Sequence, residues 1–356
     1  MQPFAFQSEI RNCLTCYAVA DTFWAVPTSN HNGGLHPMKR FRRAAVTSVL
    51  LTALLLLASP ALGDYKQAVA FYAQGKYDRA IQELKPDLDQ NPEWEFGHRL
   101  VGLCYLNLKN NALAISSLSR AAQLKSTSFS TYYGLGQAYF NMQKYDESIQ
   151  AITQGENFAK NEDQYKLHHL RGSAFFRQNR FDETVNEITE ALRGGNGDWT
   201  DYSQLGIAYH HLKRYDDAIQ ALQKSAALNP GQAMTSDFLG KAFLAKGAQS
   251  LSARQYAQSL DYLRKAKDFT PKDGYIYYNM AEALLFQKNY AEAEKALNQA
   301  LETMPKNADV LVRLGLIYEK QKKWDQALNA YQKALEITQA PGIKDAIARV
   351  TEAKKH

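Results

Sequence analysis

Small residues recur along this 356-residue chain at a nearly constant spacing, and that spacing constrains the fold more than any other feature. A first set lies 34 residues apart, with one step of 36 and one of 41: Gly102, Gly136, Gly172, Gly206, Gly240, Ala281 and Gly315. A second set lies 12 residues further on, or 19 in one unit: Ala114, Ser148, Thr184, Ala218, Ser259, Ala293 and Ala327, preceded by Ala80. Self-similarity at this period predicts a repeat protein, in which each unit packs only against its neighbours.

The composition suits a folded chain without a strongly basic surface. Hydrophobic residues make up 45% of the sequence, and the formal net charge is +6. Five of the 42 basic and two of the 36 acidic residues lie before Asp64, so half of the net charge belongs to that short segment. A nucleic-acid footprint needs basic residues gathered on one face, and the remaining balance argues against one.

Residues 38–63 have the three parts of a secretory signal peptide. A basic stretch (38–43) precedes an apolar stretch (44–58), and a small-x-small cleavage signature ends at Gly63. The apolar stretch would span about 22 Å as a helix, short of the roughly 30 Å apolar core of a bilayer. We expect cleavage after Gly63 and a periplasmic or secreted protein, with a retained signal anchor as the alternative.

Residues 1–37 do not fit such a signal. They contain Trp24, prolines and the pair Gly33-Gly34, without any periodicity. We hypothesise that this leader is unstructured and not native, and that translation starts at Met38. Peptides from this segment in the native protein would refute the hypothesis.

Each unit combines two amphipathic helices joined by a short turn. The first helix carries the small residue at position 8 and an aromatic residue or leucine at 11; the second carries an aromatic residue at 17 and the small residue at 20. The unit that begins at Trp199 shows the plan in full: Leu205-Gly206, Tyr209, Tyr215, Ala218, Leu222 and Leu228-Asn229-Pro230. Small residues at 8 and 20 let the two backbones approach closely, and aromatic rings fill the flanks. Proline at position 32 ends several second helices: Pro92, Pro230, Pro271 and Pro305.

This plan resembles the tetratricopeptide repeat (TPR) family over essentially everything after Asp64. The resemblance implies an all-α fold, a right-handed α-solenoid of about eight helix hairpins over residues 64–340. A capping helix and tail follow over residues 341–356. The units start near residues 61, 95, 129, 165, 199, 233, 274 and 308.

Two irregularities interrupt the repeat. The glycine-rich stretch 193–198 lacks the Lys-Ser/Thr and the preceding strand of a phosphate-binding loop, so we interpret it as a helix C-cap and a flexible joint. Unit six has seven extra residues between Leu244 and Tyr256. Seven residues are close to two helical turns, so we expect a longer hairpin tip with one extra turn in each helix, although Gly247 disfavours helix there.

Neither metal chemistry nor catalysis has a recognisable motif. Cys13 and Cys16 form a single C-x-x-C pair, whereas a structural zinc site needs four ligands; Cys104 is expected to be a buried small residue. The histidine pairs 168–169 and 210–211 do not predict a metal site, because adjacent helical residues point to different faces. We expect no catalytic residue, no metal and no cofactor.

In TPR proteins the first helices line a concave groove through positions 2, 5, 9, 12 and 13. Carried onto this sequence, these positions give the candidate partner-binding residues Tyr133, Gln137, Phe140, Asn141, His169, Phe176, Arg177, His210, Tyr275 and Tyr278. Further positions hold Ser173, Ile207, His211, Asp237, Lys241, Glu282 and Phe286. Aromatic rings beside amides and charges suit an extended peptide or a partner helix; the alternative is that some of them pack between helices. The Lys/Asn/Asn/Lys/Arg carboxylate clamp of one TPR subclass is not present.

The resemblance and the export signal together predict a non-catalytic protein-interaction scaffold. It would bind a partner peptide or helix in the groove and serve in the assembly of an envelope complex. We expect no nucleic-acid partner and no permanent membrane span, and leave self-association open. The alternatives are a helical-repeat RNA binder and an accessory arm that binds glycan or lipid for an envelope enzyme.

Overall fold

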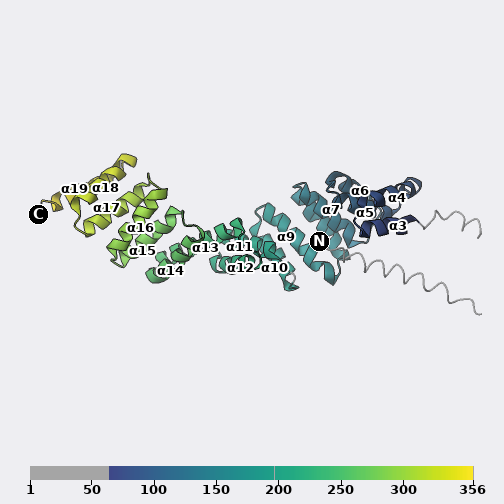
Figure 1. Cartoon of the computed structure of the whole chain (residues 1–356), viewed down its shortest axis with the longest axis horizontal. Helices are drawn as coiled ribbons and strands as arrows, with labels where there is room; N and C mark the ends of the chain where they lie inside the picture. Colours follow the sequence, from purple (N-terminus) through teal and green to yellow (C-terminus); the bar gives the residue numbers. More distant parts are fainter. Residues whose placement is uncertain (1–63, 196, 356) are drawn as a thin grey trace, which may run out of the picture. The chain divides into compact units, whose positions relative to one another are not determined.

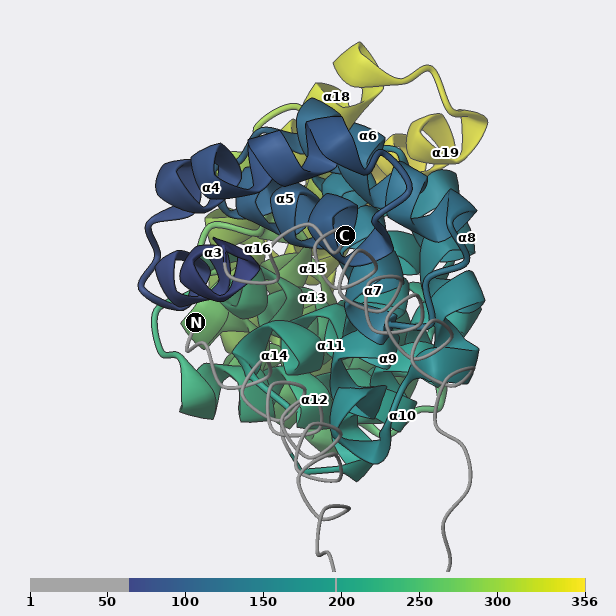
Figure 2. The same cartoon turned by 90° about the vertical axis from the view of Figure 1, so that its right-hand side faces the viewer.

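The structure, a computed structural model, describes residues 64–195 and 197–355, and its regular structure there is entirely helical. The chain divides into two compact units, Met1–Met142 and Gln143–His356, which are considered separately. The predicted signal peptide and leader lie outside the described residues. The helices of both units are labelled in Figures 1 and 2.

Within each unit, successive helices pack as antiparallel hairpins that stack on one another. The first unit contains α3 (Asp64–Ala73), α4 (Tyr77–Gln90), α5 (Glu95–Asn107), α6 (Asn111–Gln123) and α7 (Phe129–Asn141). The second unit contains α8 (Tyr145–Gly155), η2 (Glu156–Phe158), η3 (Asn161–Asp163), α9 (Gln164–Arg177), α10 (Phe181–Arg193), α11 (Trp199–His211), α12 (Tyr215–Leu228), α13 (Ala233–Ser252), α14 (Tyr256–Phe269), α15 (Gly274–Phe286), α16 (Tyr290–Thr303), α17 (Ala308–Lys320), α18 (Trp324–Ile337) and α19 (Pro341–Ala353). The all-α solenoid architecture predicted from the sequence is confirmed.

The small residues mark the close approach of the two helices of a hairpin, as predicted. A Cβ atom added at Gly206 on α11 would lie 2.5 Å from Cγ of Leu222 and 3.1 Å from the carbonyl oxygen of Ala218 on α12. Gly102 stands in the same relation to Leu118, and Gly172 to Ile188. The second set is completely buried: Ala80, Ala114, Ser148, Thr184, Ala218, Ser259, Ala293 and Ala327 each have 0% exposure.

The prediction for unit six is wrong in its register. All of the extra length lies in the first helix: α13 has 20 residues, whereas α14 has 14, the same as α12 and α16. Gly247, and not Gly240, faces the second helix, because a Cβ there would lie 2.7 Å from Leu263 and the hydroxyl of Ser259 donates to the Gly247 carbonyl at 2.8 Å. Gly240 instead lies against Thr270, at the end of α14.

The extra residues therefore lie at the N-terminal end of α13, before the part of this helix that packs against α14. Two additional turns lengthen α13 by about 10 Å. Thr235 in these turns lies 3.3 Å from the hydroxyl of Ser203 on α11 and 3.4 Å from that of Ser225 on α12. The beginning of α13 thus packs on the preceding hairpin, while its remainder forms the next one.

The connections follow local rules that the sequence anticipates. Every turn inside a hairpin has one residue with positive φ near 60°, or 72° for the glycine: Gly75, Lys109, Gln143, Asn179, Lys213, Arg254, Lys288 and Lys322. Each predicted proline follows the last residue of its second helix by two positions. Gly194 is the C-cap of α10 and Gly195 has φ of 73°, which agrees with the interpretation of this stretch as a cap and joint.

Polar pairs join several hairpins to the next. In four of them the beginning of a second helix contacts the end of the following helix or the turn or cap beyond it: Asn111–Asn141, Asp146–Gln178, Glu294–Lys323 and Asp325–Lys354. In the fifth, Asp216 at the beginning of α12 contacts Lys246 within α13. At the C-terminal end, α19 buries Ile343, Ala346 and Val350 against α17 and α18. This confirms the predicted capping helix, which protects an otherwise exposed apolar face.

Candidate functional site

The candidate residues in the N-terminal unit lie along α7. Tyr133, Gln137 and Phe140 are half-buried and Asn141 is exposed. The ring of Tyr133 lies 5.6 Å from that of Phe129, and burial raises the pKa of Tyr133. The Asn141 amide donates to Oδ1 of Asn111 on α6 at 3.1 Å, so this side chain also serves the packing of neighbouring hairpins.

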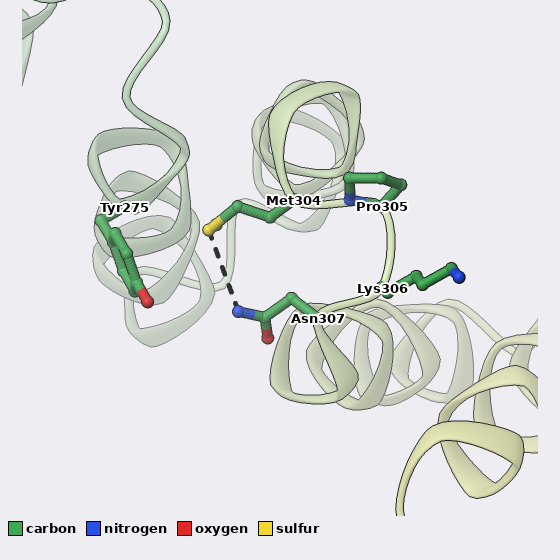
Figure 3. A pocket seen from close by; sticks show the side chains of 5 residues that line it. All are labelled: Tyr275, Met304, Pro305, Lys306 and Asn307. Atoms are coloured by element: carbon green, nitrogen blue, oxygen red, sulfur yellow. Dashed lines mark hydrogen bonds between the residues drawn. The ribbon is translucent and has the colours of Figure 1, made fainter.

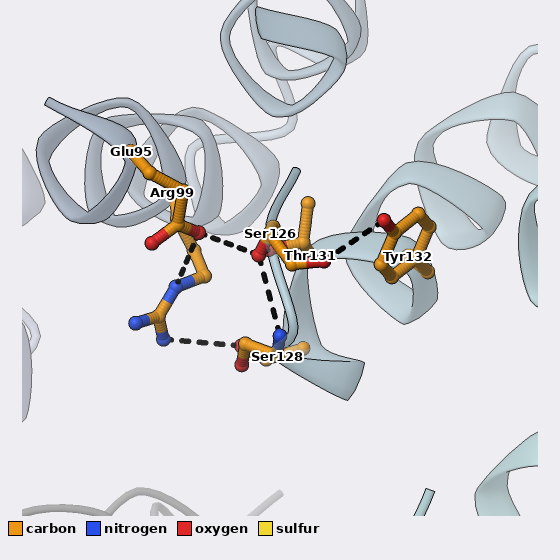
Figure 4. A network of polar contacts seen from close by, with 7 residues as sticks. Glu95, Arg99, Ser126, Ser128, Thr131 and Tyr132 are labelled. Atoms are coloured by element: carbon orange, nitrogen blue, oxygen red, sulfur yellow. Dashed lines mark hydrogen bonds and ion pairs between the residues drawn. The ribbon is translucent and has the colours of Figure 1, made fainter. Parts of the chain in front are cut away.

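A polar network connects α5 to α7 in the same unit (Figure 4). Ser126, which precedes α7, donates to Oε1 of Glu95 at 2.5 Å, and its hydroxyl lies 2.7 Å from that of Thr131. Arg99 contacts Glu95 at 3.2 Å and donates to the hydroxyl of Ser130 at 3.4 Å. Such pairs between successive first helices hold them at a fixed distance.

In the C-terminal unit the same kind of contact joins His169 on α9 to Asp201 on α11. Nδ1 of His169 donates to Oδ1 of Asp201 at 2.6 Å, and the hydroxyl of Tyr165 donates to Oδ2 at 2.9 Å. The backbone N–H of Asp198 donates to the same Oδ2 at 3.1 Å. The Asp201 side chain is fully buried, and that of His169 is 28% exposed.

The buried carboxylate determines the charge of this histidine. Burial by itself lowers the pKa of His169, but the hydrogen bond from Nδ1 to Asp201 and the charges of Asp201 and Asp198 outweigh it and raise the pKa. Burial also costs an unpaired carboxylate a large desolvation energy, which the three donors, His169 among them, offset at Asp201. When the ring is protonated, the two side chains form a partly buried ion pair between neighbouring repeats.

Phe176 and His210 lie at one aromatic cluster further along α9 and α11. Phe176 and Phe238 are half-buried against a core that includes Ile207 and Phe243. The ring of His210 lies 5.5 Å from that of Phe238, and its Nδ1 is buried without a hydrogen-bond partner among the described residues. Burial, with the charges of His211 and Lys241, lowers the pKa of His210. The two groove histidines thus have opposite shifts.

His168 lies on a different side of α9 from its neighbour. Its Nδ1 contacts Glu187 on α10 at 2.8 Å, and Arg171 contacts both Glu187 and Glu156 at 2.9 and 2.8 Å. The two adjacent histidines therefore bind different carboxylates on different helices. Among the residues that the structure describes, no three His, Cys, Asp or Glu side chains gather as a metal site.

Tyr275 and Tyr278 lie on α15 in different surroundings. Tyr275 is 59% exposed and borders a shallow depression of about 450 Å³ with Met304, Pro305, Lys306 and Asn307 (Figure 3). Tyr278 is half-buried and packs against a core that includes Ala281 and Leu314. Near it, Glu282 contacts Arg313 of α17 at 2.9 Å; burial raises the pKa of Glu282, and Arg313 opposes that shift.

The corrected register changes the groove positions of unit six. Asp237 and Lys241 are paired with each other at 2.7 Å. With Gly247 at position 8, the candidate groove positions are residues 241, 244, 248, 251 and 252, so Lys241 keeps such a position and Asp237 does not. Arg177 is exposed at the end of α9.

The structure brings His169 into contact with a residue that the sequence analysis did not select. Asp201 is recognisable locally, because Asp198 and Asp201 form a capping box at the start of α11. That pattern marks a helix start, however, and does not name His169 as the partner.

No helix in the described ranges combines the length and apolar character that a membrane crossing requires.

Comparisons with known proteins agree with the architecture. Four family models, each described as tetratricopeptide repeat, match residues 65–129, 129–161, 199–232 and 273–340. Tetratricopeptide repeat protein 21A of Mus musculus is 26% identical over 142 residues, which are 37% of this chain and 10% of that protein. Tetratricopeptide repeat protein 1 of Schizosaccharomyces pombe is 27% identical over 304 residues, 82% of this chain and 26% of that protein.

The chain thus spans between a tenth and about a quarter of these curated relatives. Among solved structures, MamA from Desulfovibrio magneticus RS-1 is similar at 22% identity and a TM-score of 0.37, over 50% of this chain and 97% of that one. Proteins built from these repeats bind protein partners and are generally non-catalytic. The repeat architecture and the matched family models show that this chain belongs to the tetratricopeptide repeat family.

Proposed function

We propose that this protein is a non-catalytic scaffold that holds a partner peptide or helix on the surface formed by its first helices. The observation that carries the proposal is the packing of those helices. Polar pairs such as His169–Asp201 and Glu282–Arg313 hold successive first helices together. Half-buried aromatic residues such as Phe140 and Phe176 remain beside them. Half-buried rings on packed helices give a partner large apolar contacts at low entropic cost.

We further propose that the scaffold works in the periplasm or cell envelope, in the assembly of an envelope complex. The signal-like segment from Met38 supports export. Cleavage after Gly63 would leave the hairpin of α3 and α4 at the start of the mature chain. There the ring of Tyr65 packs against those of Trp94 and Phe96 at 6.4 and 5.7 Å.

Photo-crosslinking in cells tests the partner. A photoreactive residue at Phe140 or Phe176 should give a discrete crosslinked protein, because both side chains lie on first helices. The same group at Gln220, exposed on the second helix α12, is the matched control. Equal crosslinking at all three positions, or none at Phe140 and Phe176, would count against the proposed surface.

N-terminal analysis of the protein recovered from the envelope fraction tests the location. We expect a chain that begins at Asp64. Recovery from the cytoplasm only, with residues 38–63 still attached, would contradict export. Recovery from the membrane with that segment attached would favour the retained anchor.

A further inference from the structure

His169 uses one ring nitrogen in a hydrogen bond within the protein and leaves the other open to a bound molecule. Its Nδ1 is bonded to Asp201, whereas its Nε2 makes no hydrogen bond within the described residues and is not enclosed by the protein. In its protonated form the partly exposed ring therefore presents the Nε2–H donor at the surface. Because the Asp201 carboxylate is fully buried, a bound molecule cannot easily displace it from Nδ1.

The carboxylates near His169 are already occupied by intramolecular donors. Asp201 accepts from Tyr165 and from the backbone of Asp198, in addition to the histidine. Asp198 accepts from the backbone N–H groups of Thr200 and Asp201 at 2.7 and 3.1 Å.

The remaining charges around α9 are paired as well. Lys166 on α9 contacts Asp163 of η3 at 3.5 Å. On the side that faces α10, His168 and Arg171 are paired with Glu187, and Arg171 also with Glu156. The acids named here around α9 therefore each have a partner within the protein.

Arg177 adds a second cation on the same helix. It lies eight residues beyond His169, about 12 Å along α9. Its side chain is exposed and has no ion pair within the described part of the chain. Ser173 lies between the two, and its hydroxyl is already used in a hydrogen bond of 3.1 Å to Gln204.

We propose that His169 and Arg177 form a binding site for the carboxylates of an acidic partner segment, with Asp201 as the residue that positions His169. The proposal rests on the proposed function and specifies the chemistry of the partner. Two cationic side chains whose backbone positions lie about 12 Å apart along one helix match acidic side chains several residues apart on an extended or helical peptide. Charge complementarity of this kind sets partner choice more than it sets raw affinity.

Binding should depend on pH through His169. The hydrogen bond to Asp201 and the charge of Asp201 raise the pKa of this histidine against the effect of burial, so the ring keeps its proton to higher pH than a free imidazole and becomes neutral as pH rises further. Loss of that charge removes the attraction for a carboxylate. His210, whose pKa is lowered, titrates at lower pH.

A defined peptide pair tests the site. We would measure fluorescence anisotropy of labelled (Glu-Ala-Ala)₅ and (Gln-Ala-Ala)₅ with the full-chain protein in low salt, from pH 5.5 to 8.5. The glutamate peptide should bind more tightly, and its affinity should fall as pH rises. His169→Gln and Arg177→Gln should each weaken binding about twofold to fivefold, the range for exposed charge pairs. The matched control is Arg264→Gln, another exposed arginine, which should have no effect.

The variant Asp201→Asn separates positioning from simple contact. It should move the midpoint of the pH profile to lower pH while binding persists at acid pH. Circular dichroism checks its fold, and the His169 and Arg177 variants carry the test if it does not fold. Equal affinity for both peptides, or an unchanged pH profile in His169→Gln, would overturn the proposal, as would tight binding of a labelled 15-nucleotide RNA without peptide binding. A partner crosslinked at Phe176 in that case would leave the scaffold function intact.

Discussion

Because two helices approach closely at Gly206, a glycine-to-alanine substitution should destabilise the fold there and stabilise it at Gly342, where there is space. In Gly206→Ala the new methyl group would lie 2.5 Å from Cγ of Leu222, a fully buried branched carbon, and 3.1 Å from the carbonyl oxygen of Ala218. Relief requires α11 and α12 to separate. Overpacking of this kind costs about 1–3 kcal/mol, and the upper end applies because backbone as well as side chain must shift. The gain in helix propensity returns about 1 kcal/mol.

The net expectation for Gly206→Ala is a loss of about 2 kcal/mol in the free energy of unfolding. The matched control is Gly342→Ala in α19, where no atom lies within 4 Å of the added Cβ. There only the helix propensity changes, so the free energy of unfolding of this variant should rise by up to about 1 kcal/mol. Urea unfolding followed by circular dichroism measures both, with midpoints shifting by about 1 M for 2 kcal/mol at an m-value near 2 kcal/mol/M. If Gly206→Ala were as stable as Gly342→Ala, the helices would not be in contact there and the packing argument would be wrong.

Three further outcomes are expected. Gly247→Val should lower the urea midpoint, because Cβ would meet Leu263 at 2.7 Å; a neutral effect would contradict the corrected register of α13. Lys213→Gly should raise the free energy of unfolding by about 0.5–1 kcal/mol, since φ of 60° strains a residue with a Cβ. Asn179→Gly should raise it by less, because asparagine tolerates that region of φ. Equal increases in the two variants would refute this reasoning. The pKa of His169 is raised in the folded state, so the stabilisation of the fold by its charge is complete below pH 6.5 and is lost as pH rises through the folded pKa. His169→Gln should therefore be less stable than wild type at pH 6, and the difference should be smaller at pH 9. A constant difference in urea midpoint across this range would contradict this expectation.

Much of the architecture was predictable because the information is local. Small residues at fixed positions determine where two helices can approach, and a proline two residues after a second helix ends it regardless of what surrounds it. The C-terminal helix was predictable for the same reason, since Pro341 at its first turn and its apolar stripe are features of one short segment. The candidate surface was predictable only as a set of positions.

The sequence by itself determined the repeat, its period and the hairpin plan, because backbone geometry at glycine, alanine and proline needs no knowledge of distant residues. The tertiary structure decided the register of α13. Gly240 and Gly247 are seven residues apart and fall on nearly the same face of a helix. Contact with Leu263 and Ser259 selects Gly247, which also lies 12 residues before Ser259, the spacing of the other repeats. The partner of His169 was decided in the same way. Asp201 lies 32 residues further along the chain, and no local spacing encodes which of the acids there will be buried against that ring.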